Sequence, residues 1–275
     1  MVIETAKLPR FDSTPVVETI LGVFFRPLSR MTSAHQGILW EKCFRERFPK
    51  LEERAPIEEV RERFGDERAT PVELQWRISG RPDTPRLWLM SEGGEHVLQM
   101  QPNALLANWL RVSKDRGYRP FDVRRTEFQE DLRRVHQFVQ DHDLGQIVPT
   151  SCIVTYINHF ALKSFDRLSP ELAETVTAWQ KHRSDDWLPD PDNVVFEIGY
   201  PMPDHAGRLN VKASPVFCKP GNEKVIRFEL TARVTVDDMD LESAIAKMDF
   251  AHEWVVRGFV SITTEQKHHD WGRTR

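Results

Sequence analysis

The chain has 275 residues, of which 40% are hydrophobic and 29% are charged, so it is long enough to bury a core and too apolar for a disordered chain. Its formal net charge of −4 excludes the overall basic excess of proteins that bind nucleic-acid backbone without sequence preference. The predicted elements begin with a strand over residues 16–25, which are rich in β-branched and aromatic side chains. A helix is expected over residues 32–48, where apolar residues recur at helical spacing.

A highly charged segment follows this first helix. Ile57, Val60 and Phe64 fall at helical spacing within it, and Gly65 comes directly after them. This pattern predicts a second, short helix that ends at the glycine.

Three strands and a helix complete the first half of the chain. The strands are expected over residues 72–78, 87–90 and 97–101. An apolar stripe predicts the closing helix over residues 126–141.

The second half repeats this order of elements. Residues 151–158 indicate a strand, and Ser169 followed by Pro170 is typical of a helix start. Further strands are expected over residues 194–198, 209–213 and 225–236, and a final amphipathic helix over residues 241–262.

The shared order indicates an internal duplication. His136 and His252 lie at similar places in the two closing helices, and we expect each to be a hydrogen-bonded core residue. The alternative is that many chains of this class show such a pattern without duplication. We predict an α+β fold with two similar strand–helix–three-strand–helix halves, residues 1–145 and 146–275, packed together as one body. Its antiparallel sheets would carry the helices on one face.

The other sheet face is expected to be polar, because each alternating strand has one buried face and one wet face. Such a face is a natural place to dock a partner, and it is equally an ordinary solvated surface. Our candidate interaction residues on this face are Arg77, Gln99, Gln101, Arg227 and Arg233.

Phosphate-binding loops, nucleophile elbows and zinc-protease motifs are absent from the sequence. The three cysteines, Cys43, Cys152 and Cys218, suggest neither a disulfide framework nor a zinc site. An acidic group could hold a divalent cation, although acidic loops are usually only solvated turns; it comprises Asp185, Asp186, Asp190, Asp192 and Glu197. We therefore name no catalytic residue, no metal ligand and no cofactor.

Several short sequence segments, which we call strings, together resemble those of a sporadically distributed bacterial and archaeal protein family of unknown function. The strings are residues 15–18, 98–101, 108–109, 117–121, 156–158, 251–253 and 271–273. The resemblance implies one unit that spans the whole chain, and it supplies no reaction or cofactor. The patchy distribution of the family is similar to that of accessory genes in mobile or defence loci.

The residues of these strings also have a physical interpretation. Asn108 and Asn158 carry amides that can bond exposed backbone, and Trp109 and Trp271 combine a large apolar surface with one N–H donor. With Tyr156 they are candidates for an interaction site or for a structural role. A buried Trp271 would also hold the C-terminal segment, with its adjacent His268 and His269, against the body of the protein.

The leading hypothesis is a non-catalytic, cytoplasmic interaction protein that docks a protein partner, as an accessory component of a mobile or defence-type locus. No signal segment and no apolar run long enough to span a bilayer is evident, so we expect no membrane partner. The first alternative is nucleic-acid binding by the open sheet face or by an arginine-rich region, which comprises Arg116, Arg119, Arg124, Arg125, Arg133 and Arg134. The second alternative is a metal-dependent hydrolase or nuclease. The oligomeric state is left open.

Overall fold

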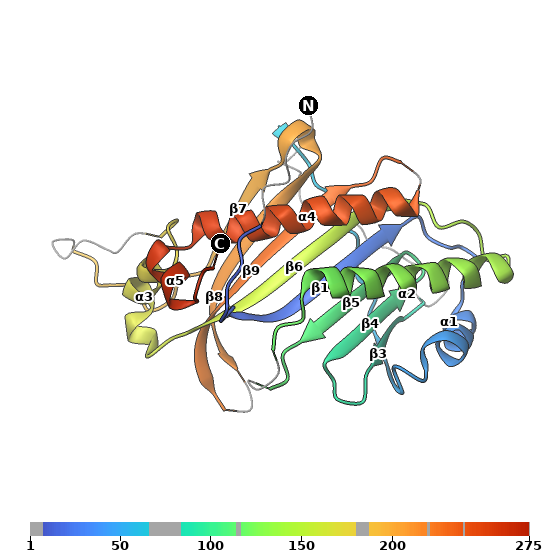
Figure 1. Cartoon of the computed structure of the whole chain (residues 1–275), viewed down its shortest axis with the longest axis horizontal. Helices are drawn as coiled ribbons and strands as arrows, with labels where there is room; N and C mark the ends of the chain where they lie inside the picture. Colours follow the sequence, from blue (N-terminus) through green and yellow to red (C-terminus); the bar gives the residue numbers. More distant parts are fainter. Residues whose placement is uncertain are drawn as a thin grey trace.

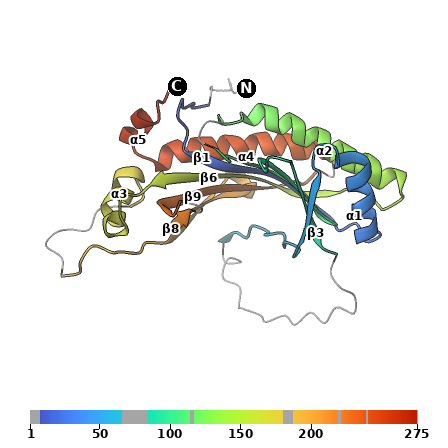
Figure 2. The same cartoon turned by 90° about the horizontal axis from the view of Figure 1, so that it is seen from below.

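A computed structural model describes residues 8–65, 84–113, 117–179, 187–218, 221–238 and 240–274. Within these residues the strands form one antiparallel, nine-stranded open sheet in the order β2-β3-β4-β5-β1-β6-β9-β8-β7. The two long helices, α2 and α4, lie side by side on one face of this sheet (Figures 1 and 2). The predicted mixture of helices and an antiparallel sheet is confirmed.

The first half of the chain contributes five strands to the sheet. In order its elements are β1 (Val16–Phe25), α1 (Ser33–Leu39), the π-helix η1 (Trp40–Phe44), β2 (Lys50–Arg54), β3 (Arg86–Met90), β4 (His96–Gln101), β5 (Ala104–Leu110) and α2 (Phe121–Asp141). The strand over residues 16–25 is confirmed, and the predicted helix over residues 32–48 forms as α1 and η1. The strand predicted over residues 72–78 lies outside the described residues.

The second half contributes the other four strands. Its elements are β6 (Pro149–Ala161), the short 3-10 helix η3 (Phe165–Arg167), α3 (Leu168–Thr175), β7 (Phe196–Pro201), η4 (Pro203–His205), β8 (Gly207–Cys218), β9 (Glu223–Thr235), α4 (Leu241–Ile262) and α5 (Glu265–Asp270). The helix over residues 241–262 is confirmed at both ends. Its start is capped by the Asp240 carboxylate, which accepts a hydrogen bond from the Ser243 amide at 3.2 Å.

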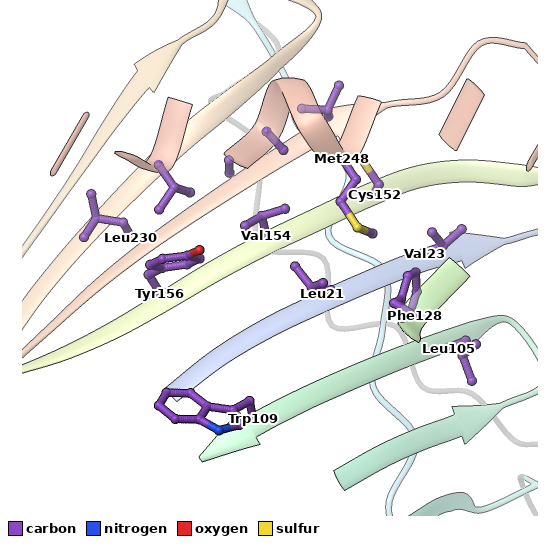
Figure 3. Close-up of a cluster of buried hydrophobic side chains, with 14 of the residues drawn as sticks. Leu21, Val23, Leu105, Trp109, Phe128, Cys152, Val154, Tyr156, Leu230 and Met248 are labelled. Atoms are coloured by element: carbon purple, nitrogen blue, oxygen red, sulfur yellow. The ribbon is translucent and has the colours of Figure 1, made fainter. Parts of the chain in front are cut away.

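The core lies between the sheet and the two long helices. β1 and β6 pair at the centre of the sheet, with Leu21 opposite Val154 in the register. Leu21, Val154 and Tyr156 belong to this core, and Figure 3 shows them in one cluster of buried side chains with Met248 of α4. Because β1 belongs to the first half and β6 to the second, the two halves share one sheet and one core.

The expected short helix at residues 57–64 is wrong. We call residues 55–65 the strap. Residues 55–64 of the strap form neither helix nor strand, and the segment crosses the sheet face opposite the helices (Figure 2). The side chain of Gln101 bonds both the amide and the carbonyl of Ile57, at 3.0 and 2.8 Å. Val60, expected on the apolar stripe, is 55% exposed. The Gln101 side chain on β4 therefore satisfies the backbone groups of Ile57, which a helix would have bonded internally.

Candidate functional site

A cavity of about 1000 Å3 lies on the helix side of the sheet. Its walls come from the N-terminal segment before β1, from the start of α2 and from the middle of α4. Its floor includes Tyr156 and Asn158 of β6 and Leu230 of β9. Figure 3 shows Tyr156 and Leu230 on neighbouring strands below α4. This volume is at the upper end of the range of sites that bind drug-sized molecules.

Asn158 supplies the floor with a buried acceptor. Its side chain is 1% exposed, and its Nδ2 donates a hydrogen bond of 3.2 Å to the carbonyl of Phe228. No atom of the described residues donates to its Oδ1. A buried polar atom without a partner is uncommon in folded proteins, so it needs an explanation.

A pair of tyrosines lies beside Asn158. The hydroxyl groups of Tyr118 and Tyr156 are 2.7 Å apart, so one donates a hydrogen bond to the other. Burial raises the pKa of both phenols above the ordinary value of 10. Both tyrosines are therefore neutral hydrogen-bonding groups near physiological pH.

His252 of α4 forms part of the wall. Its ring stacks on Phe121, the first residue of α2, with 3.7 Å between ring centroids. Burial lowers the pKa of His252 to about 4, although the nearby Asp122 carboxylate acts in the opposite direction. The imidazole is therefore neutral at pH 7 and bonds as one donor and one acceptor.

The charged groups of the cavity lie at its rim. Arg125 of α2 donates to both carboxylate oxygens of Asp249 of α4, with the longer bond at 2.8 Å. This ion pair joins the two long helices across the opening. The other charged lining residues are Arg10, Asp122 and Glu253.

The candidate residues named from the sequence do not assemble into one site. Tyr156 and Asn158 line the cavity, whereas Trp109 is buried on the same sheet face with its ring edge-on to Tyr118 at 5.7 Å. Trp271 follows α5 and stacks on Phe160 at 5.3 Å, as a residue that holds the C-terminal segment in place. The remaining candidates lie on the opposite sheet face, apart from Arg77, which lies outside the described residues.

On that opposite face the candidate side chains bond other groups of the chain. Gln99 donates to Asn108 at 2.7 Å, and Gln101 is bonded to the strap. Arg227 pairs with Glu229 at 2.5 Å, and Arg233 reaches Glu62 of the strap at 3.5 Å. The strap thus covers part of the surface that the sequence predicted to be open.

The arginine-rich region also bonds within the chain. Arg124 is buried and donates to the carbonyl of Ala107 at 2.9 Å, with its pKa lowered to about 10 by burial. Around it Arg119 pairs with Glu127, Arg125 with Asp249, Arg133 with Glu242, and Arg134 with Asp131. Arg116 lies outside the described residues.

The acidic group is only partly described. Asp185 and Asp186 lie outside the described residues, and Glu197 pairs with Lys212 at 3.0 Å. Among the residues whose placement is described, no group of three or more His, Cys, Asp or Glu side chains could hold a metal ion. In the C-terminal segment His268 bonds the hydroxyl of Thr263 at 2.8 Å.

Sequence reasoning did not name three residues of the cavity as site candidates. Tyr118 and Phe121 lie in the string 117–121, and His252 was expected to be an ordinary core residue. The signal that could have found them was present, because the strings 15–18, 117–121, 156–158 and 251–253 all contribute lining residues. His136, the expected counterpart of His252, does not line the cavity.

A comparison with protein-family models finds no matching family, and a comparison with curated proteins finds no relative. Across the described ranges, no helix combines the length and apolar character needed to cross a membrane.

Proposed function

We propose that this chain is a non-catalytic binding protein whose binding site is the cavity between α2 and α4. The observation that carries the proposal is the cavity of about 1000 Å3, whose lining combines aromatic rings with the polar side chains of Tyr118, Tyr156 and His252. The cavity therefore offers a space of ligand size with apolar walls and a small number of polar groups.

The chemistry of the lining supports binding in preference to catalysis. A general base works best when its pKa lies near the working pH, and the pKa of His252 is about 4. The two buried phenols have raised pKa values and stay protonated. These groups suit the orientation of a ligand by hydrogen bonds.

The proposal is tested with N-phenyl-1-naphthylamine, a neutral probe whose fluorescence rises in apolar surroundings. We expect saturable binding to the full chain at one site. Val256 lines the cavity from α4, so Val256→Trp is expected to fill it and to abolish the signal. Val123→Trp is the matched control, because Val123 is 44% exposed on α2 and does not line the cavity.

Thermal unfolding of both variants checks that each is folded. Absence of saturable binding by the wild-type chain would overturn the proposal. Equal binding by the two tryptophan variants would place the probe elsewhere and overturn it as well.

Docking of a protein partner is the second candidate function, and the edge strand β7 favours it. β7 pairs with β8 on one side, and within the described residues it is the last strand of the sheet. Val195 and Tyr200, before and within it, are 68% and 38% exposed. An exposed edge with apolar side chains can accept a strand from another protein.

Charges on this edge test the second candidate. A tagged chain purified from its own cells is expected to retain a stoichiometric partner, which the double variant Val195→Lys, Tyr200→Lys loses. Val112→Lys, at a 49% exposed position after β5, is expected to retain it. A partner that survives the double variant would remove β7 from consideration. Membership of a defence-type locus and a cytoplasmic location stay predictions.

We also propose that the two halves arose by duplication. The order β1-β5-β4-β3 on one side of the sheet centre matches β6-β9-β8-β7 on the other. Each half ends in a long helix, α2 or α4. The strand β2 has no counterpart in the second half of the sheet order, so the halves differ at the outer edge.

A further inference from the structure

The imidazole of His252 gives the binding site described above a polar group that a ligand can reach. His252 lines the cavity from α4 and is half-buried. Neither ring nitrogen bonds an atom of the described residues, and neither is among the unpartnered atoms that are shut off from solvent. The Oδ1 of Asn158, by contrast, is fully enclosed. The hydrogen-bonding capacity of the imidazole is therefore available to a molecule in the cavity.

The ring of His252 is held in one orientation by its aromatic neighbours. It stacks on Phe121 with 1° between the ring planes, and it lies tilted against Tyr156 with 5.8 Å between the centroids. Burial keeps the imidazole neutral at pH 7. The tautomer of a histidine is set by the bonds that its nitrogens make, so here a ligand can set it. A hydroxyl group, which both donates and accepts, can bond the imidazole in either tautomer.

The walls around His252 are mainly apolar. The cavity is lined by the four phenylalanines Phe11, Phe121, Phe250 and Phe259, of which Phe11 and Phe259 meet edge-on at 5.7 Å. Apolar surface gains free energy when it leaves water for such surroundings. A ligand that fills this space is therefore expected to be apolar over most of its surface.

The charged groups at the rim compensate one another. Arg125 pairs with Asp249, and Glu253 accepts a hydrogen bond from Arg257 at 2.7 Å. The charged lining residues that remain are Arg10 and Asp122, which have opposite signs. Within the described lining no net charge attracts an ion to the opening. An ion in the apolar interior would also lose its hydration without a facing counter-charge.

From the accessible imidazole, the apolar walls and the balanced rim, and resting on the proposed binding function, we infer that the cavity takes a neutral, mainly apolar molecule whose hydroxyl group bonds a ring nitrogen of His252. The ligand class is therefore an apolar alcohol or phenol, and His252 is the residue that selects the hydroxyl group. No covalent bond is made or broken in this association.

The probes for the test are 2-naphthol and naphthalene, because they share one bicyclic outline and only 2-naphthol carries a hydroxyl group. Their dissociation constants are measured by ligand-observed NMR titration of the full chain at neutral pH. His252→Phe removes both ring nitrogens and keeps a ring that can stack on Phe121. We expect the preference for 2-naphthol over naphthalene to fall about fivefold in this variant, the value of one hydrogen bond.

His136→Phe is the matched control, because His136 is a half-buried histidine of the other long helix, α2, and does not line the cavity. It is expected to keep the wild-type preference. A second measurement observes the bond in the wild-type chain, through the NMR resonances of the imidazole nitrogens. Addition of 2-naphthol is expected to shift the resonances of His252, and naphthalene to leave them nearly unchanged. If His252→Phe does not fold, His252→Gln serves to assign these resonances.

The outcomes separate the two proposals. If neither 2-naphthol nor naphthalene binds and N-phenyl-1-naphthylamine also fails, the binding function itself is overturned. If both bicyclic probes bind and the preference is unchanged in His252→Phe, the hydrogen bond to His252 is overturned while the binding function stands. Tighter binding of the anion 2-naphthoate than of 2-naphthol would overturn the neutral character of the ligand.

Discussion

The ring of His252 lies flat on the ring of Phe121, with 3.7 Å between the centroids and 1° between the planes. This contact joins the middle of α4 to the first residue of α2, so it holds together one helix from each half of the chain. It also encloses the imidazole among apolar groups, which is why burial lowers the pKa of His252 to about 4.

The stability of the protein is expected to fall between about pH 6.5 and pH 4. The unfolded chain takes up a proton at His252 near the ordinary value of 6.5, whereas the folded chain resists protonation until about pH 4. Acid therefore favours the unfolded state across this window, by at most about 1.4 kcal/mol per unit of pKa difference. Above pH 6.5 this contribution is complete and does not vary with pH.

Thermal unfolding of wild type and His252→Phe from pH 7.5 to pH 4 measures this contribution. Phenylalanine keeps the stacking on Phe121 and does not titrate, so the variant is expected to lose less stability in acid. His96, whose pKa is also lowered to about 4 by burial, contributes in the same direction in both proteins. His269→Gln, at an exposed position, serves as the control. The same pH profile for wild type and His252→Phe would show that His252 is not the source.

Loosening of the C-terminal part of the strap is expected from Glu62→Ala. The Glu62 carboxylate accepts hydrogen bonds from Arg208 at 2.7 Å and from Asn210 at 3.1 Å. Nearby, Phe64 lies under the Arg208 guanidinium and stacks on His205. Without the carboxylate the strap loses these two bonds to β8 and keeps the one that Arg208 donates to the carbonyl of Arg63 at 2.7 Å. Trypsin is therefore expected to cleave at Arg61 and Arg63 several times faster.

The matched control for the strap is Glu58→Ala. Glu58 is exposed on the same segment, so its replacement is expected to leave the cleavage rate unchanged. The midpoint of thermal unfolding reports on the rest of the fold and is expected to shift little in either variant. Equal cleavage rates in Glu62→Ala and wild type would contradict the assigned role of Glu62.

The parts of the fold that sequence predicted well are those whose pattern is local. β1 is rich in β-branched and aromatic residues and α4 carries its own helical periodicity, so their residues identify them without reference to the rest of the chain. β5 was not expected because five of its seven residues are buried, on both faces of the sheet, which removes the alternation of a half-buried strand. β2, with the sequence Lys-Leu-Glu-Glu-Arg, is a charged edge strand with only Leu51 partly covered.

The candidate site was less predictable for a related reason. Tyr118, Tyr156 and His252 are far apart in sequence and meet only because β6 lies beneath α4 and beside the start of α2. Their residue types suit a core as well as a site. The unpartnered acceptor of Asn158 is likewise a property of the packed structure, because it depends on which bonds the neighbouring strand leaves unmade.

Arg47→Met is expected to lower the free energy of unfolding by about 2 kcal/mol, because it removes a partner of a buried carboxylate. Asp131 of α2 is 3% exposed and pairs with Arg47, which follows η1, and with Arg134 at 3.0 Å. Burial raises the pKa of Asp131, and the two arginines oppose that rise. Urea unfolding at pH 7 measures the loss.

Arg45→Met provides the comparison for Arg47. Arg45 pairs with Glu41 at 2.6 Å, and both side chains are more than half exposed. Exposed pairs of this kind contribute about 0.5 kcal/mol or less. A loss in Arg45→Met as large as that in Arg47→Met would mean that burial of Asp131 does not set the energy of its ion pair.

Two glycines in helices are expected to respond to alanine in opposite directions. A Cβ at Gly258 of α4 would lie 2.3 Å from Cδ2 of Leu209, a buried residue of β8, so α4 must approach the sheet closely there. A Cβ at Gly37 of α1 would meet no atom within 4 Å. Alanine is the better helix former by about 1 kcal/mol, so Gly37→Ala is expected to raise the free energy of unfolding by that amount.

At Gly258 the same gain is outweighed by overpacking, and Gly258→Ala is expected to lower the free energy of unfolding by about 1–3 kcal/mol. Urea unfolding of the two variants measures both signs under one set of conditions. In the double variant Gly258→Ala, Leu209→Ala the contacting methyl group is gone, so the part of the destabilisation that comes from the clash is expected to be relieved. The variant also loses the free energy that burial of the Leu209 side chain contributes. A rise in stability for Gly258→Ala alone would show that Leu209 can move aside, and that α4 is not held to β8 by this close approach.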